Sequence, residues 1–172
     1  MMINITGVGI TGKSSLRRML KKIFPRVIAV DGDYEEMPDF DENRTYIIED
    51  VHALMSEACL PLDNYNLIIY LLPDLFTHTL FWLKRVWRWI QNGEGSWEKK
   101  TQAWLGSGKK YDPVNIPLFI RLMIRDLSNR RQWINNDVDV LSKFKGEIIL
   151  IQVRLNRKGI KYLIPSKFKP FN

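Results

Sequence analysis

A glycine-rich segment near the start of the chain constrains the fold more than any other feature. The segment reads Gly7-Val8-Gly9-Ile10-Thr11-Gly12-Lys13-Ser14. The short, largely apolar segment 3–6 precedes it and predicts a β-strand. Residues 13–24 follow it with apolar side chains at helical spacing, which predicts a helix. Glycines let a backbone curl so that successive N–H groups point to one side. The sequence therefore predicts a strand, a tight loop and a helix N-terminus in direct succession.

This segment matches the pattern G-x-x-x-x-G-K-[ST], the phosphate-binding loop or P-loop, at every fixed position. The N-terminus of the following helix adds a partial positive charge that favours anions. We expect Lys13 to contact the β- and γ-phosphates and Ser14 to ligate Mg²⁺, with Ser15 completing the binding segment. The expected ligands are ATP, or another nucleoside triphosphate, and Mg²⁺.

Strand-like and helix-like segments alternate along the rest of the chain. The strand-like segments are apolar on both faces, which is typical of a parallel sheet covered by helices. The sequence thus predicts a single α/β domain, a three-layer P-loop NTPase fold with a mainly parallel, five-stranded sheet. Residues 160–164 follow a turn signal and are expected to form a hairpin with the last strand. The predicted strands are residues 3–6, 26–30, 46–49, 67–72 and 147–153.

Carboxylates follow the second and third predicted strands. Asp31 and Asp33 flank a glycine after the second strand, and Glu49 and Asp50 end the third. At the carboxyl ends of parallel strands, such side chains point into the ligand crevice. We expect Asp33 first, and Asp31 second, to accept a proton from an attacking hydroxyl, and Glu49 and Asp50 to hold Mg²⁺. The alternative interpretation is a set of solvated turns, since Asp and Gly are favoured turn residues.

These motifs resemble those of the small P-loop kinases that phosphorylate metabolites. Adenylylsulfate kinases and gluconate kinases carry Asp-Gly-Asp after the second strand, and uridine kinases carry Asp-Asp there. The run Glu49-Asp50-Val51-His52-Ala53-Leu54 is similar to the Glu-Gly-x-His-Ala-Leu run of uridine kinases and phosphoribulokinases, and departs from it at Asp50. The resemblance covers the chain up to about residue 90 and implies an ATP-dependent phosphotransferase.

Positive charge is concentrated in one stretch of the chain. Residues 79–131 contain 11 Lys and Arg against 4 Asp and Glu, which accounts for the formal net charge of +7, whereas residues 31–50 are strongly acidic. A basic stretch can form a nucleic-acid surface or cover a phosphorylated ligand. We expect a lid at residues 91–117 within the domain. In the kinases that the chain resembles, lid arginines neutralise the transferred phosphoryl group, and Arg85 and Arg125 are the candidates here.

The six tryptophans lie in the basic stretch or just after it. Trp87 falls on an apolar helical stripe and is expected in the core. Trp82 and Trp89 widen that stripe, which raises the alternative of a homodimer face.

The leading hypothesis is a kinase that moves the γ-phosphoryl group of ATP to an acceptor hydroxyl or phosphate on a small molecule, nucleoside or nucleotide. The alternatives are a polynucleotide kinase or other nucleic-acid-acting NTPase that uses residues 79–133, and a non-catalytic ATP-binding protein. The single cysteine, Cys59, excludes an internal disulfide, and no apolar run reaches the ~18 residues of a membrane span. We therefore expect a cytoplasmic protein that does not bind membranes.

Overall fold

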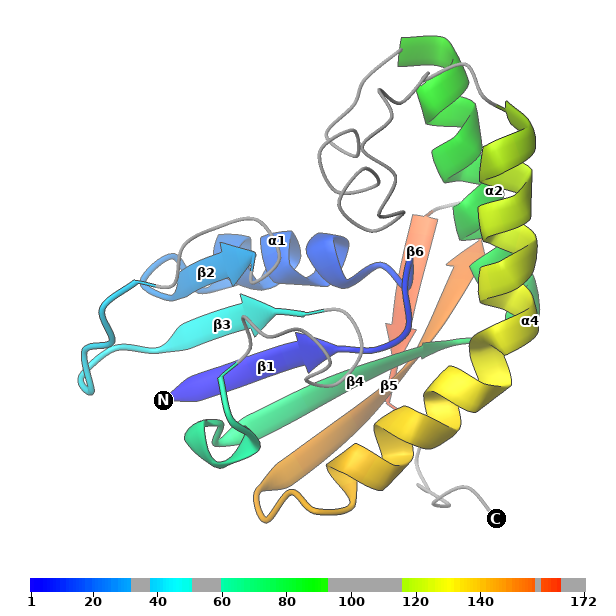
Figure 1. Ribbon diagram of the computed structural model, residues 1–172. Helices are drawn as coiled ribbons and strands as arrows, with labels where there is room; N and C mark the ends of the chain where they lie inside the picture. The colour runs from blue at the N-terminus through cyan, green and yellow to red at the C-terminus, as the bar shows by residue number, and fades with distance from the viewer. Residues whose placement is uncertain (32–37, 51–59, 93–115, 157–158, 165–172) are drawn as a thin grey trace.

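The computed structural model describes residues 1–31, 38–50, 60–92, 116–156 and 159–164, with backbone alone for residues 88–92 and 116–119. It is an α/β structure built on one twisted six-stranded sheet (Figure 1). The strands are β1 (Met2–Thr6), β2 (Ile28–Asp31), β3 (Tyr46–Glu49), β4 (Leu67–Pro73), β5 (Glu147–Asn156) and β6 (Gly159–Leu163). The helices are α1 (Lys13–Ile23), α2 (Leu75–Asn92) and α4 (Ile116–Leu141), with a short 3₁₀ helix at Leu62–Asn64.

The strand order across the sheet is β2-β3-β1-β4-β5-β6. The ladders β2–β3, β3–β1, β1–β4 and β4–β5 are parallel, and β5–β6 is antiparallel, so the sheet is mixed. The expected hairpin after the last strand is confirmed, with Gly159 at a φ of 126° where the chain enters β6. The prediction of five strands is wrong, because this hairpin adds β6 to the sheet as a sixth, edge strand.

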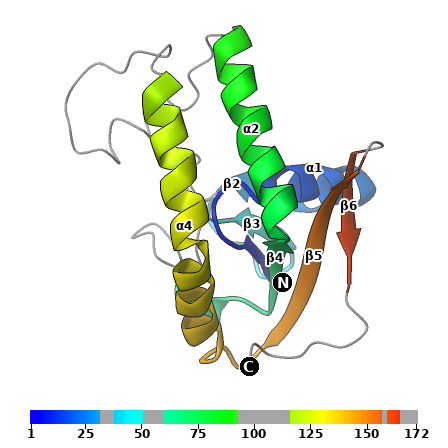
Figure 2. The same cartoon turned by 90° about the vertical axis from the view of Figure 1, so that its right-hand side faces the viewer.

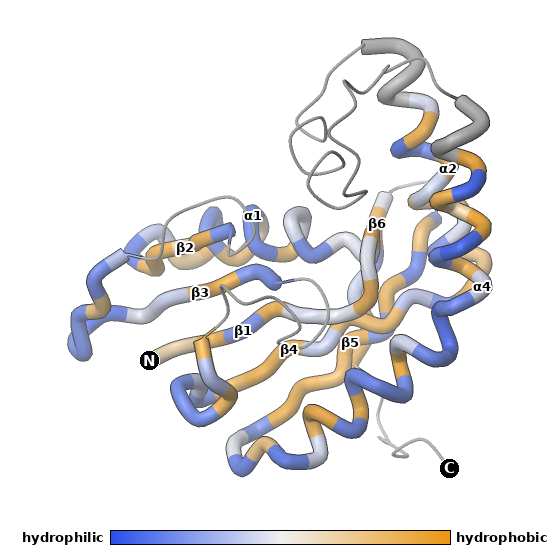
Figure 3. Tube along the Cα trace, viewed as in Figure 1, coloured by the Kyte–Doolittle hydropathy of each residue, from blue (hydrophilic) through white to orange (hydrophobic). Residues whose placement is uncertain are grey.

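Two hydrophobic clusters hold the helices against opposite faces of the sheet. On one face, Ile5 and Ile69 pack with Leu16 of α1. On the other face, Ile68 packs with Leu141 near the end of α4. Figure 3 shows the apolar residues concentrated along the central strands, as expected when both faces are covered.

Helices α2 and α4 lie side by side at one end of the sheet (Figures 1 and 2). Trp82 is 1% exposed and packs against Leu122 of α4. The expectation that Trp87 is a core residue is wrong, since Trp87 is 59% exposed. Phe76 and Leu83 share its outward stripe. The sequence pattern gave Trp82 to this stripe and to the alternative homodimer face, but Trp82 lies on the neighbouring face of α2, which α4 covers.

Several predicted features fall outside the described residues. Almost the whole predicted lid, residues 91–117, lies there, because α2 ends at Asn92 and α4 begins at Ile116. Asp33, the first choice for a general base, also lies there. Within the described ranges, no helix is long and apolar enough to span a membrane.

Candidate functional site

The glycine-rich loop, residues 7–14, curls as it leaves β1, and its glycines allow the backbone conformation that this requires. Gly7 and Gly12 have φ values of 142° and 89°, which L side chains rarely adopt. A Cβ on Gly7 would lie 2.5 Å from the Leu71 carbonyl oxygen of β4, so this position has room for glycine alone. Ile10 also has a positive φ, of 57°, which is a strained conformation for a β-branched residue.

The loop starts at the centre of the sheet. Strand β1 pairs with β3 on one side and β4 on the other, and the connections after it lead first to one side and then to the other. Such a switch point, outside the carboxyl ends of parallel strands, is where open α/β sheets bind ligands. The loop therefore lies where the topology alone would place a binding site.

The side chain of Lys13 is drawn into this loop. Lys13 is 4% exposed, and its Nζ donates hydrogen bonds to the Gly7 and Val8 carbonyls at 3.0 and 3.1 Å. No side chain in the described part of the chain caps the start of α1 at Gly12, and no acidic residue lies in its first turn. The ammonium group and the positive end of the helix thus act together, which favours an anion.

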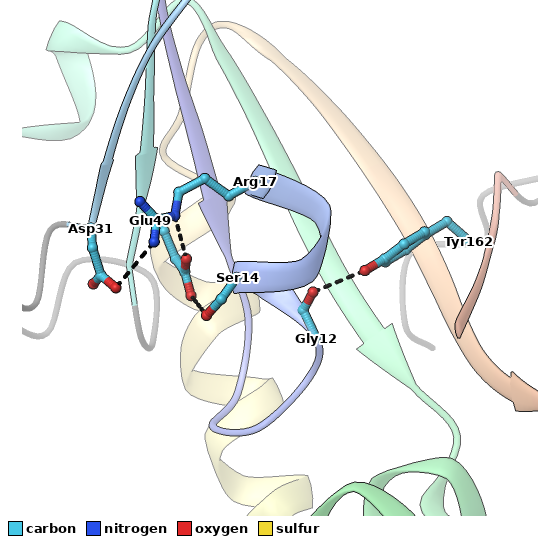
Figure 4. Close-up of polar contacts among 6 residues, drawn as sticks. All are labelled: Gly12, Ser14, Arg17, Asp31, Glu49 and Tyr162. Carbon is cyan, nitrogen blue, oxygen red and sulfur yellow. Dashed lines mark hydrogen bonds and ion pairs between the residues drawn. The ribbon is translucent and has the colours of Figure 1, made fainter. Parts of the chain in front are cut away.

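Two predicted site residues meet beside the loop. The Ser14 hydroxyl donates to Glu49 Oε1 at 2.6 Å, and Glu49 is 6% exposed at the end of β3 (Figure 4). The other carboxylate oxygen accepts from Arg17 Nε at 2.9 Å. The same guanidinium reaches Asp31 at the end of β2, at 3.4 Å. Arg17 therefore links the two strand ends and orients Glu49 toward Ser14.

Arg17 was not among the residues that the sequence singled out. The signal was the spacing from Ser14, because residues i and i+3 lie on one side of a helix. Asp50 is fully buried at the same edge, and its amide donates to the Ile5 carbonyl at 3.0 Å. Within the described ranges there is no group of three or more His, Cys, Asp or Glu side chains that could hold a metal. A Mg²⁺ ion here would take most of its ligands from phosphate and water, as this ion commonly does.

Two side chains from distant elements hold carbonyls of the loop. His78 of α2 is fully buried, and its Nε2 lies 2.7 Å from the Gly9 oxygen. Burial lowers the pKa of His78 to about 4, so the ring is neutral near pH 7. The Tyr162 hydroxyl of β6 donates to the Gly12 carbonyl at 2.9 Å (Figure 4). Burial raises the pKa of Tyr162 to about 12.

One carboxylate of α4 also lies beside the loop. A Cβ on Gly9 would lie 3.7 Å from Asp126 Oδ2, and Asp126 is 7% exposed. Burial raises the pKa of Asp126 to about 6, although the ion pair with Arg125 at 3.3 Å opposes this shift. Arg125 pairs with Asp126, and its side chain is 40% exposed, so its role as a lid arginine stays a prediction. Arg85 lies half-buried on α2.

The structure brings together the loop, Ser14, Glu49 and Asp31, which the sequence singled out. It adds Arg17, His78, Tyr162 and Asp126, whose side chains match no sequence motif. No protein-family model matches this chain, and no curated protein is significantly similar to it.

Proposed function

We propose that the protein is an ATP-dependent phosphotransferase with a P-loop NTPase fold. It binds a nucleoside triphosphate with Mg²⁺ at residues 7–15 and transfers the γ-phosphoryl group to a small-molecule or nucleotide acceptor. The observation that carries this proposal is the buried Lys13 amine inside the curled loop, at the edge of the sheet where Ser14 meets Glu49. A lysine, a hydroxyl and a carboxylate in this relation are the parts that phosphoryl transfer uses.

The loop residues fit a polyphosphate. The close approach of Gly7 to β4 and the positive φ of Gly12 give a curl that a larger residue at either position would strain. An ammonium group carries three N–H donors, so Lys13 can exchange loop carbonyls for phosphate oxygens without leaving the loop. The uncapped amides of the first turn of α1 supply further donors.

Ser14 and Glu49 fit Mg²⁺ in the same way. When bound, the ion would neutralise charge on the phosphates and so favour transfer. Ser14 would supply the hydroxyl ligand, and Glu49 would hold a water of the ion or the ion itself. Arg17 donates a hydrogen bond to the second carboxylate oxygen of Glu49, which keeps the first oxygen directed at Ser14.

The acceptor is expected beside the end of β2. Asp31 forms an ion pair with Arg17, so Asp33, two residues further along the chain, remains the predicted general base. The Asp31-Gly32-Asp33 run is the part of the resemblance to metabolite kinases that bears on the acceptor. It favours transfer to a hydroxyl, because a carboxylate at this edge can take up the hydroxyl proton.

Turnover measurements test the proposal. ATP hydrolysis and transfer are measured with a panel of nucleosides, sugars and nucleotides, and then with single-stranded oligonucleotides at two salt concentrations. We expect one small-molecule class to stimulate ATP consumption. Asp33→Asn should lower turnover with little change in ATP affinity, whereas Asp39→Asn, a control in the exposed acidic stretch, should change neither. Full activity in Asp33→Asn would exclude Asp33 as the base.

One observation favours the nucleic-acid alternative. Trp87 is 59% exposed, and the exposed Lys84 lies three residues before it on α2. An aromatic face beside a cation can stack a base and contact a phosphate. Turnover that appears only with oligonucleotides and falls steeply with salt would support this alternative and refute the metabolite kinase.

A further inference from the structure

We infer that His78 is a positioning residue for phosphate binding, which holds the Gly9–Ile10 peptide so that the Ile10 amide faces the phosphates. The inference rests on the proposed function, and it assigns a role to a residue far from the loop in the sequence. In a planar trans peptide, the carbonyl of one residue and the N–H of the next point in opposite directions. Fixing the Gly9 oxygen on the outer side of the loop therefore fixes the Ile10 N–H on the inner side.

The placement of His78 is rigid. It lies in the first turns of α2, where its own amide donates to the Asp74 carbonyl at 2.9 Å. The Asp74 side chain caps the helix by accepting from the Thr77 amide at 2.7 Å. The imidazole is fully buried and meets the Gly9 oxygen at 2.7 Å. A capped helix start thus carries the ring to a fixed point against the loop.

The ring can act here only as a donor. A carbonyl oxygen accepts, so Nε2 must carry the hydrogen and Nδ1 must be the unprotonated nitrogen of the neutral ring. Nδ1 is buried and has no hydrogen-bond partner among the described residues. The cations Arg130 and Lys13 add to the effect of burial, and together they outweigh the Gly9 bond and keep the pKa of His78 low. The tautomer that donates to Gly9 is therefore fixed near neutral pH.

Helix α2 also contacts Ile10, the residue on the other side of the Gly9–Ile10 peptide bond. Ile10 packs against the cluster of Trp82 and Leu122, and Trp82 lies one turn after His78 on α2. Ile10 has the left-handed backbone conformation, at a φ of 57°, which is strained for a β-branched residue. His78 on the carbonyl and Trp82 on the side chain thus hold a peptide that would otherwise relax.

Two substitutions separate the hydrogen bond from the bulk of the ring. His78→Gln keeps an N–H donor at a similar reach, whereas His78→Leu fills the space without a donor. Tyr70→Phe is the control, because its hydroxyl donates to Asp137 at 2.7 Å and is equally buried but does not contact the loop. The dissociation constant of Mg–ATP is measured by calorimetry, and the ¹H–¹⁵N spectrum of each protein is recorded without nucleotide.

We expect His78→Leu to weaken Mg–ATP binding about 10-fold, as the loss of one well-placed donor would, and to shift or broaden the Ile10 amide signal. His78→Gln should stay within about 3-fold of the wild type, and Tyr70→Phe should lower stability without changing affinity. If His78→Leu does not fold, His78→Asn, whose shorter amide falls short of Gly9, replaces it.

Unchanged affinity in His78→Leu, or equal weakening in His78→Leu and His78→Gln, would overturn the role of the donor. If the wild type binds no nucleoside triphosphate, the proposed function fails. The spectra then decide the rest: an Ile10 signal that is the same in His78→Leu and in the wild type would show that His78 does not hold this peptide.

Discussion

The ion pairs of Arg17 lead to a stability prediction with a built-in control. One guanidinium meets Glu49 at 2.9 Å and Asp31 at 3.4 Å, and the three side chains are 17%, 8% and 14% exposed. Arg17→Met keeps much of the apolar length of the side chain but takes this cation away from both carboxylates. The remaining negative charges then lie close together at the strand ends, largely shielded from water.

The exposures set the expected size of the effect. Removing one partner of a buried ion pair costs about 3–5 kcal/mol, whereas exposed pairs contribute about 0.2–1 kcal/mol. Arg17 is nearer the buried limit, so Arg17→Met should lower the free energy of unfolding by about 2–3 kcal/mol. Arg44 pairs with Asp41 at 3.2 Å, with exposures of 61% and 45%. Arg44→Met should therefore have little effect on the free energy of unfolding.

Urea denaturation at pH 7, followed by circular dichroism, measures both variants in low salt and in 1 M NaCl. Salt should remove the small effect of Arg44→Met and leave most of that of Arg17→Met, because buried charges are screened less. Adding Glu49→Gln to Arg17→Met should restore part of the lost stability by removing the charge left behind. If Arg17→Met costs no more than Arg44→Met, the guanidinium is not held between the strand ends in solution.

Three further predictions concern the loop and the groups packed on it. Gly7→Ala should cost about 3 kcal/mol or more in denaturation experiments, because its Cβ would meet the Leu71 carbonyl, whereas Gly159→Ala, at a similar φ but in open space, should cost about 1 kcal/mol; equal losses would contradict the close approach. The pKa of His78 is about 4 in the folded chain, so between pH 6.5 and 4 only the unfolded chain binds this proton, and the His78 contribution to stability should fall by about 3 kcal/mol as the pH falls through that window. His78→Gln should remove this dependence, and an unchanged slope in the variant would refute it. The pKa of Asp126 is raised from 3.8 to about 6, so the folded chain binds this proton more tightly than the unfolded chain does. The stability that the bound proton provides is therefore lost as the pH rises from about 4 through 6. Asp126→Asn should therefore stabilise the protein at pH 7 by about 3 kcal/mol and have little effect near pH 4; no gain at pH 7 would show that the carboxylate is well solvated.

The sequence predicted most of the framework because the relevant signals are local. The continuous apolar run at residues 67–72 corresponds to β4, and the glycine-rich segment corresponds to the turn between β1 and α1. Residues 46–49 match β3 at both ends. In each case the length, the apolar pattern and the flanking turn residues agree, so tertiary context had little to change.

Most of the missed features depend on distant parts of the chain. His78 and Tyr162 meet carbonyls of the loop from α2 and β6, and nothing near them in the sequence indicates this contact. Trp82 and Trp87 lie on two apolar faces of one helix, and only the packing of α4 decides which face is buried. Arg17 differs from these residues, because its spacing from Ser14 was visible in the sequence. Its charge, however, favoured the interpretation of a side chain in solvent.

The binding of Mg–ATP to the wild type and to Lys13→Met tests the central claim most directly. Lys22→Met is the matched control, since Lys22 is an exposed lysine on the same helix. Calorimetry should show Mg–ATP binding by the wild type and by Lys22→Met, and affinity reduced about 100-fold or more in Lys13→Met, with circular dichroism showing that all three are folded. A wild type that binds no nucleoside triphosphate, or a Lys13→Met variant that binds as tightly as the wild type, would contradict the assignment of residues 7–14 as a phosphate-binding loop.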